Sequence, residues 1–214
     1  MQIHCSALLF DLDGVLVDSR SVVERVCRRW ALRHHLDPQD VLRVAHGRRT
    51  RDTVKTLTPH VDVDREVEWL DGAELVDVDG LREVPGARRF LETLRSESWG
   101  VVTSCGQALA RLRLTSVGLP LPKILVTSEE VERGKPAPDG YLVGARRLGY
   151  DPAACVVFED APPGIAAARA AGARVIALRT THPDADFSGA DVVMEDFERA
   201  HVRRDGDGYV IRVE

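Results

Sequence analysis

The feature that most constrains the fold is a regular alternation of short apolar runs and helix-like stretches after residue 84. The short runs match buried strands, and the stretches between them carry apolar residues at helical spacing. A chain that alternates in this way forms right-handed βαβ units on a parallel sheet. We expect helices near residues 87–97, 107–116, 138–148 and 163–171, strands near residues 100–103, 124–126, 154–158, 174–178 and 190–193, and a hairpin about Gly206.

Residues 18–80 differ, because helical spacing occurs there without strand-like alternation. Asp18 and Ser19 can cap a first helix, which runs to about residue 32. Further helices are expected near residues 38–45, 50–57 and 63–76. The apolar run at residues 7–10 reads as another strand of the sheet. The sequence therefore predicts a doubly wound, Rossmann-like α/β core of residues 1–17 and 83–214, with an all-helical cap domain inserted at residues 18–82.

The strand at residues 7–10 ends in two carboxylates, in the segment Asp11-Leu12-Asp13-Gly14. Side chains two positions apart at a strand end point to the same side, so both carboxylates enter one small volume. They repel each other there unless a cation joins them. In open α/β sheets, ligands bind beyond the carboxyl ends of the strands, where this pair is expected to lie.

Three further polar segments follow later strands or lie in adjoining loops. Thr103-Ser104 follows an apolar run, Gly134-Lys135-Pro136 holds one of three lysines in the chain, and Glu159-Asp160 follows another apolar run. They add a hydroxyl, an ammonium group and two more carboxylates to the edge where Asp11 and Asp13 are expected. Asp-x-Asp-Gly alone is a weak signal of function, but the four segments in this order form a specific one.

These segments resemble, in order and spacing, the four motifs of the haloacid dehalogenase superfamily of phosphotransferases, and the likeness covers nearly the whole chain. Within that superfamily the chain most resembles bacterial sugar and hexitol phosphatases and the related polyol-phosphate phosphatases. The narrower likeness lies in residues 46–50, 119–122, 130–136 and 158–162. The resemblance implies a Mg²⁺-dependent phosphomonoester hydrolase that acts on a small sugar or polyol phosphate through an aspartyl-phosphate intermediate.

The resemblance also implies which groups react and which hold the metal. Asp11 is expected to be the nucleophile at phosphorus. Asp13 is expected to protonate the leaving oxygen and then to take a proton from water. The carboxylates of Asp11, Glu159 and Asp160, with the backbone carbonyl of Asp13, are expected to bind Mg²⁺, since they are hard oxygen ligands. Asp160 could also cap the helix that begins near Pro163.

The remaining expected site residues bind the substrate. Thr103 and the backbone amide of Ser104 are expected to donate to phosphoryl oxygens, and Lys135 to offset the charge of the phosphate and the nucleophile. In the cap, the basic segment 46–51 could meet the hydroxyls of the leaving group, with His46 and Arg49 as the first candidates. A solvated turn between two helices is the alternative reading of that segment.

Composition limits the partners and the compartment. A chain of 214 residues with 44% hydrophobic and 29% charged residues is ordinary for a soluble globular protein. A net charge of -5 argues against a nucleic-acid or anionic-membrane surface, because either needs a basic footprint. Four scattered cysteines without Cys-x-x-Cys spacing, and no signal peptide or long apolar span, favour a reduced, cytoplasmic protein.

Other functions share parts of this pattern. A β-phosphoglucomutase has the same four motifs and a helical cap, but those enzymes carry a histidine ten residues after the second Asp, where this chain has Val23. Haloacid dehalogenases and phosphonatases lack the second Asp of the first motif, so Asp13 argues against both functions. Lys55 in the cap keeps the phosphonatase function as an open alternative. A phospho-accepting receiver domain is much shorter and has no place for the helical insert. The particular sugar or polyol and the oligomeric state stay open.

Overall fold

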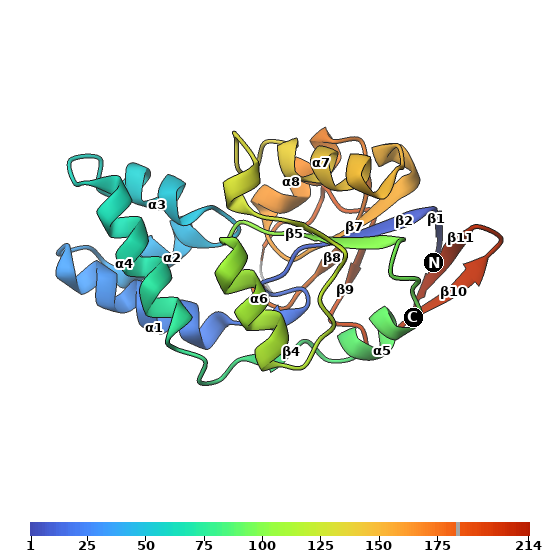
Figure 1. The fold of residues 1–214 in the computed structure, drawn as a ribbon, viewed down its shortest axis with the longest axis horizontal. Coiled ribbons are helices and arrows are strands. Elements are labelled where there is room, and N and C mark those ends of the chain that lie inside the picture. Colours follow the sequence, from blue (N-terminus) through green and yellow to red (C-terminus); the bar gives the residue numbers. More distant parts are fainter. Residues whose placement is uncertain (183–184) are drawn as a thin grey trace.

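The computed structural model describes residues 1–182 and 185–214 and has the expected α/β architecture (Figure 1). Its main sheet has six parallel strands in the order β6-β5-β2-β7-β8-β9. Counted along the chain, this order is third, second, first, fourth, fifth and sixth, which is the doubly wound order with its switch point beside the first strand. The strands are β2 (Ala7–Phe10), β5 (Trp99–Val102), β6 (Ile124–Val126), β7 (Cys155–Glu159), β8 (Arg174–Leu178) and β9 (Val192–Met194).

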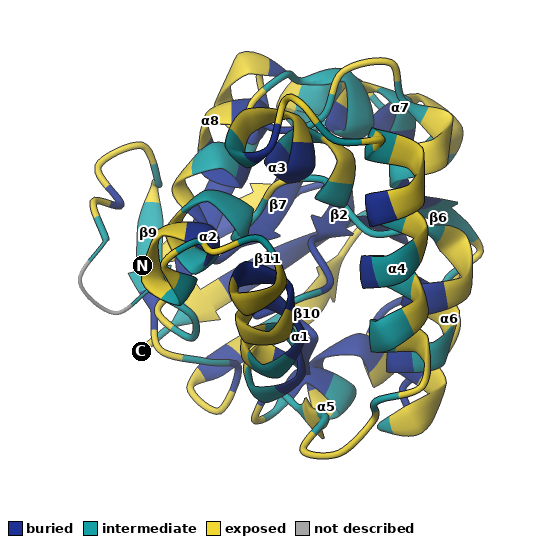
Figure 2. Cartoon of the chain, turned by 90° about the vertical axis from the view of Figure 1, so that its left-hand side faces the viewer, coloured by how far each residue is buried: buried dark blue, intermediate teal, exposed yellow. Residues whose placement is uncertain are grey.

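Both faces of this sheet are covered by helices, as the alternating pattern predicts. Leu8 and Phe10 of β2 pack against α5 and α6, whereas Ala7 and Leu9 pack against α7 and α8. All four side chains are therefore buried, and β2 and β7 lie in the dark interior of Figure 2. A strand covered on both faces has to be apolar throughout, which explains the unbroken run at residues 7–10. The helices are α5 (Ala87–Glu92), α6 (Gln107–Ser116), α7 (Asp139–Leu148) and α8 (Pro162–Ala170).

Four helices, here called the cap, lie between residues 18 and 82 in the sequence and form a separate group beside the sheet in Figure 1. They enclose an apolar cluster of their own that includes Val26, Trp30 and Leu70. The chain leaves the core through β3 (Val17–Asp18) and returns through β4 (Arg82–Glu83), which pair antiparallel. The domain boundaries at residues 18 and 82 stay a prediction. The cap helices are α1 (Arg20–Arg33), α2 (Pro38–Ala45), α3 (Thr50–Leu57) and α4 (Val63–Leu75).

The structure has a small antiparallel sheet that the sequence predicts only in part. The expected hairpin is present as β10 (Ala200–Asp205) and β11 (Gly208–Val213), but β11 also pairs with β1 (Gln2–Cys5). Residues 2–5 are separated from β2 by Ser6 alone, so the two strands read as one segment.

The helix expected at residues 87–97 is shorter than predicted, because α5 ends at Glu92. The backbone N–H of Arg95 donates to the Tyr209 hydroxyl at 2.9 Å instead of continuing the helix. Two short 3-10 turns, η1 (Ser128–Glu130) and η2 (Pro152–Ala154), complete the secondary structure. Among the described residues, no helix is long and apolar enough to cross a membrane.

Candidate active site

The sheet order brings four of the polar segments together. Because β2 lies between β5 and β7, the residues that follow these strands meet at one edge of the sheet. Asp11 follows β2, Thr103 follows β5, and Glu159 is the last residue of β7. Lys135 reaches the same edge from the loop before α7, through a contact with Asp11 described below.

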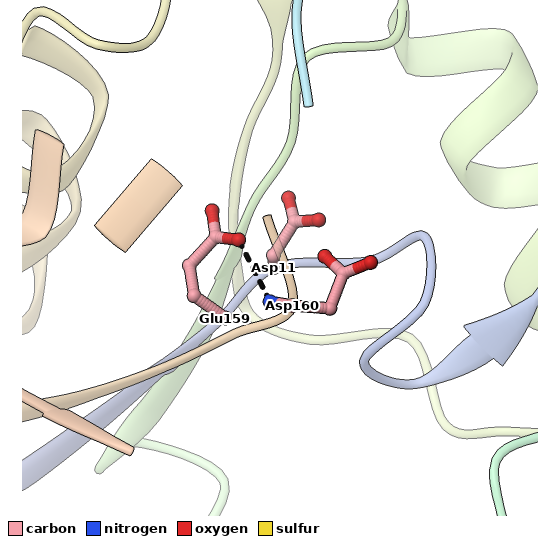
Figure 3. A group of neighbouring side chains, drawn as sticks. All are labelled: Asp11, Glu159 and Asp160. Carbon is pink, nitrogen blue, oxygen red and sulfur yellow. Dashed lines mark hydrogen bonds between the residues drawn. The ribbon is translucent and has the colours of Figure 1, made fainter. Parts of the chain in front are cut away.

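Three buried carboxylates form the centre of the site (Figure 3). Asp11, Glu159 and Asp160 each offer an oxygen atom, and these three atoms lie within 4.8 Å of one another. The Lys135 ammonium donates to Asp11 Oδ1 at 2.6 Å and to Glu159 Oε1 at 2.5 Å. One buried ammonium thus binds two of the three buried carboxylates and has no such contact with Asp160, which leaves an excess of negative charge.

The excess of negative charge contributes to raised pKa values of two of the carboxylates. Burial raises the pKa of Asp11 to about 7, with Lys135 opposing the rise and Glu159 adding to it. Burial, Glu159 and Asp11 together raise the pKa of Asp160 well above its ordinary value. A divalent cation would relieve both effects, and three carboxylates form a hard-oxygen donor set of the kind that Mg²⁺ prefers. The residues therefore fit the expected metal.

Glu159 is held by four hydrogen bonds. Besides Lys135, the Tyr141 hydroxyl donates to Oε1 at 2.7 Å, and the backbone N–H groups of Asp160 and Ala161 donate to Oε2 at 2.9 and 3.2 Å. These bonds fix the carboxylate within the site. Tyr141 was not predicted, since a tyrosine on the apolar face of a helix reads as an ordinary core residue.

The turn after β2 requires glycine. Gly14 has a φ of 80°, and a Cβ atom there would lie 2.1 Å from Asp160 Oδ2. The backbone can therefore approach the Asp160 carboxylate only without a side chain. The helix α8 begins after Ala161 and has no side-chain cap, so the alternative capping role of Asp160 is not observed.

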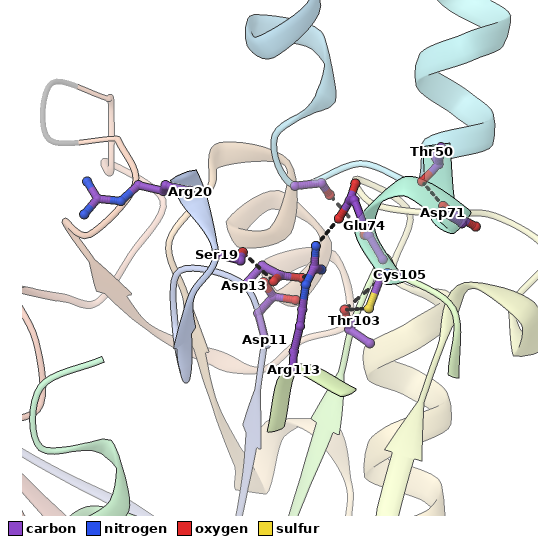
Figure 4. A network of polar contacts seen from close by, with 12 residues as sticks. Asp11, Asp13, Ser19, Arg20, Thr50, Asp71, Glu74, Thr103, Cys105 and Arg113 are labelled. Carbon is purple, nitrogen blue, oxygen red and sulfur yellow. Dashed lines mark hydrogen bonds and ion pairs between the residues drawn. The ribbon is translucent and has the colours of Figure 1, made fainter. Parts of the chain in front are cut away.

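Asp13 is held from two sides (Figure 4). The Ser19 hydroxyl donates to its Oδ1 at 2.6 Å, and Arg113 of α6 donates to its Oδ2 at 2.5 Å. Arg113 also donates to Glu74 of α4. Arg113 and Glu74 were not predicted from the sequence, although a signal was present: Arg113 shares the buried face of α6 with Leu114.

The two predicted phosphate-binding residues after β5 have partners in this structure. The backbone N–H of Cys105 donates to the Thr103 hydroxyl oxygen at 3.2 Å. The Ser104 hydroxyl donates to the carbonyl of Gly47 in the cap at 3.1 Å. The Ser104 side chain thus joins core and cap, which leaves its backbone N–H as the group proposed for phosphate.

A cavity of about 110 Å³ lies between the core and the cap. Its core lining includes Asp11, Asp13 and Thr103, and its cap lining includes His46 and Thr50. The acidic centre is therefore open to a small ligand that the cap would cover.

The structure brings one of the two cap candidates to this cavity. His46 lines it, and its buried Nε2 has no hydrogen-bond partner among the described residues. Arg49 does not line it, since its guanidinium donates to Asp52 at 2.7 Å and to the carbonyls of Val131 and Glu132 at 3.2 and 3.1 Å. Arg49 therefore ties the start of α3 to the core loop that carries Lys135.

Comparison with known proteins agrees with this geometry. Residues 5–172 match the family model of the haloacid dehalogenase-like hydrolases. The chain is 39% identical to hexitol phosphatase A of Escherichia coli over 97% of this chain and 99% of that protein. It is 35% identical to glycerol-1-phosphate phosphohydrolase 2 of Saccharomyces cerevisiae over 94% of this chain and 86% of that protein.

A solved structure shares the fold. A hydrolase from Pseudomonas syringae superimposes with a TM-score of 0.79 at 27% identity, over 90% of this chain and 94% of that one. The resemblance found in the sequence is confirmed, and the chain belongs to the family of haloacid dehalogenase-like hydrolases.

Proposed function

We propose that this protein is a Mg²⁺-dependent phosphatase that hydrolyses small sugar or polyol phosphates through a phosphorylated Asp11. The observation that carries the proposal is the pairing of Asp11 with Lys135 in a buried cluster of carboxylates beneath a cavity. The names of both curated relatives describe phosphatases, one of hexitols and one of glycerol 1-phosphate, and both substrates are polyol phosphates.

The metal would be held by the side chains of Asp11, Glu159 and Asp160 and the backbone carbonyl of Asp13. When bound, Mg²⁺ supplies positive charge to the phosphoryl oxygens. Lys135 donates to Asp11 Oδ1 and so restricts the orientation of the carboxylate that would attack phosphorus. The same ammonium offsets the charge that nucleophile and phosphate share.

The other core residues complete the proposed reaction. The Thr103 hydroxyl and the Ser104 backbone N–H donate to the phosphoryl oxygens. Asp13 gives a proton to the leaving alcohol as the bond to phosphorus breaks. It then takes a proton from the water that attacks phospho-Asp11, which releases inorganic phosphate and restores the enzyme.

The cavity lining suits a leaving group rich in hydroxyls. Burial, His182 and Arg20 lower the pKa of His46 to about 4, so its imidazole is neutral near pH 7 and can exchange hydrogen bonds with a hydroxyl. Thr50 adds a hydroxyl, and Trp30 adds an apolar wall against C–H groups. The small cavity and the net charge of -5 favour a small-molecule substrate over a nucleic acid.

Hydrolysis is favoured over a mutase reaction. Val23 lines the cavity at the position where the resembling mutases carry a histidine. A valine can neither give nor take a proton. We also propose a cytoplasmic location, because all four cysteines are free thiols, as expected in a reducing compartment.

The test is release of phosphate from hexitol, hexose and glycerol phosphates with Mg²⁺, by wild type and by Asp11→Asn. The amide has nearly the same shape but cannot attack phosphorus, so we expect turnover to vanish. The matched control is Asp207→Asn, at an exposed carboxylate in the β10–β11 turn, which should keep wild-type rates.

Two results would contradict the proposal. One is an Asp11→Asn variant that retains about a tenth of the wild-type rate, because a missing nucleophile costs orders of magnitude. The other is release of no more than one phosphate per wild-type chain, which would indicate a phospho-acceptor instead of an enzyme.

A further inference from the structure

Arg113 is an arginine inside the protein. Its side chain lies on the buried face of α6, beside Leu109 and Leu114, and the residue is 3% exposed. A guanidinium group in such a place loses its hydration and persists only if carboxylates replace the lost water. Its partners therefore indicate why an arginine is present there.

Those partners come from the two halves of the molecule (Figure 4). One end of the guanidinium donates to Asp13 Oδ2 at 2.5 Å, in the core. The other end donates to Glu74, in the last turn of the cap helix α4. A single planar group thus connects the proposed general acid to the cap, which a lysine with its one ammonium nitrogen could not do in the same geometry.

The second oxygen of Asp13 is also held from the cap side. Ser19 donates to Asp13 Oδ1 at 2.6 Å, and Ser19 directly precedes the first cap helix. With each of its two oxygens hydrogen-bonded, the Asp13 carboxylate has one orientation. The bond from Arg113 lies within the core, and it is tied to the cap through the second contact of the guanidinium, with Glu74.

We propose that Arg113 is a positioning residue for Asp13, and that Glu74 makes this positioning depend on the docking of α4 against α6. The proposal rests on the phosphatase function and on the role of Asp13 proposed above. Its consequence is that Asp13 is aligned for proton transfer only when the cap covers the cavity, so that the leaving group is protonated away from bulk water.

The test compares a substrate that needs a general acid with one that does not. Glycerol phosphate loses a poor leaving group and needs protonation, whereas p-nitrophenyl phosphate loses a stable phenolate without it. The variants are Arg113→Met, Glu74→Gln and the double variant. The double variant removes both charges of the buried Arg113–Glu74 pair together, which protects folding if Arg113→Met alone is unstable.

The matched control is Arg25→Met, which removes another arginine with two bonds to a carboxylate. Arg25 donates to Asp77 at 3.0 and 2.7 Å and does not line the cavity. Melting curves of all variants, recorded with Mg²⁺, report whether each one folds.

For Arg113→Met and the double variant we expect kcat on glycerol phosphate to fall about 100-fold, the low end of what a positioned general acid contributes, with KM changed by less than about threefold. With p-nitrophenyl phosphate we expect a rapid burst of about one equivalent of phenolate per chain and then slow turnover. The first step still proceeds there, while hydrolysis of phospho-Asp11 lacks its aligned base.

If Glu74 acts through Arg113, the double variant should lose no more activity than Arg113→Met alone, and Glu74→Gln should show the same pattern at smaller size. Arg113→Lys should recover part of kcat, since its ammonium can still donate a hydrogen bond to Asp13.

Wild-type kcat in the folded double variant would overturn the inference. An equal loss on both substrates without a burst would also overturn it, because it would indicate a merely structural role. If the wild-type enzyme turns over neither substrate nor any other phosphomonoester, the proposed function itself fails, and that outcome is distinct because it precedes any comparison of variants.

Discussion

His46 makes the stability of this protein sensitive to acid. Its Nε2 atom is buried without a partner among the described residues, and its ring lies 4.7 Å from the ring of His182. Burial, His182 and Arg20 lower the pKa of His46 from 6.5 to about 4. Between these two values the unfolded chain binds a proton at this position and the folded chain does not. Stability is therefore lost as the pH falls through that interval.

The size of the effect follows from the two pKa values. The full difference between 6.5 and about 4 corresponds to about 3 kcal/mol of unfolding free energy. At about pH 5 most of the unfolded chains are protonated there and few folded ones are, so about 2 kcal/mol is already lost relative to pH 7. Replacing the imidazole with a phenyl ring removes this term, because phenylalanine cannot bind a proton.

The assay is urea unfolding of wild type and His46→Phe at a series of pH values between about 7 and 5. Since other groups titrate in both proteins, the difference between the two free energies isolates His46. As the pH falls from about 7 to 5, we expect this difference in unfolding free energy to change by about 2 kcal/mol in favour of His46→Phe. The control is His60→Phe, at an exposed histidine, which should follow wild type. Two parallel curves for wild type and His46→Phe would refute the reasoning.

Three further predictions concern the metal, a close contact and the cap. Excess EDTA should abolish turnover and Mg²⁺ should restore it, while Ca²⁺, with its larger and looser coordination shell, should substitute poorly; full activity in EDTA would count against the metal. Gly164→Ala should lower the free energy of unfolding in urea by about 1–3 kcal/mol, because the new Cβ would overlap the Glu159 carboxylate. The control Gly72→Ala, where the new Cβ would meet open space, should raise that free energy by roughly 0.5–1 kcal/mol. Arg49→Ala should lower specificity constants for all substrates by a common factor of about ten, since Arg49 ties cap to core, whereas His46→Ala should change their ranking; a changed ranking for Arg49→Ala would contradict this reading.

Much of the fold could be predicted because its signals are local. The helix near residues 107–116 and the strand near 174–178 are found in the structure with the same bounds, since their apolar spacing is set by the sheet they pack on. The shortening of α5 could not be predicted, because its cause, the Tyr209 hydroxyl, comes from the far end of the sequence. The pairing of β1 with β11 has the same kind of distant cause.

The candidate site likewise has residues that the sequence predicts and residues that it does not. The carboxylates after β2 and β7 could be located because parallel strands deliver their ends to one edge. The contacts of Arg49 and Arg113 could not be predicted, because both side chains have partners in the core and in the cap, and these partners meet only in the folded chain. The sequence of α6 does place Arg113, a charged residue, among the apolar positions of the helix. The spacing of these positions does not predict that its partners are Asp13 and Glu74.

The small sheet of β1, β11 and β10 bears on how the protein is made. β11 lies between the other two strands, so residues 2–5 have no partner in that sheet until residues 208–213 have been synthesised. Residues 2–5 thus leave the ribosome about two hundred residues before the strand that pairs with them. Contacts between such distant residues slow folding and keep unpaired strand edges exposed while translation proceeds. We therefore expect ribosome-bound nascent chains that stop before residue 208 to expose β1 to proteases, and chains that have released residue 213 to protect it.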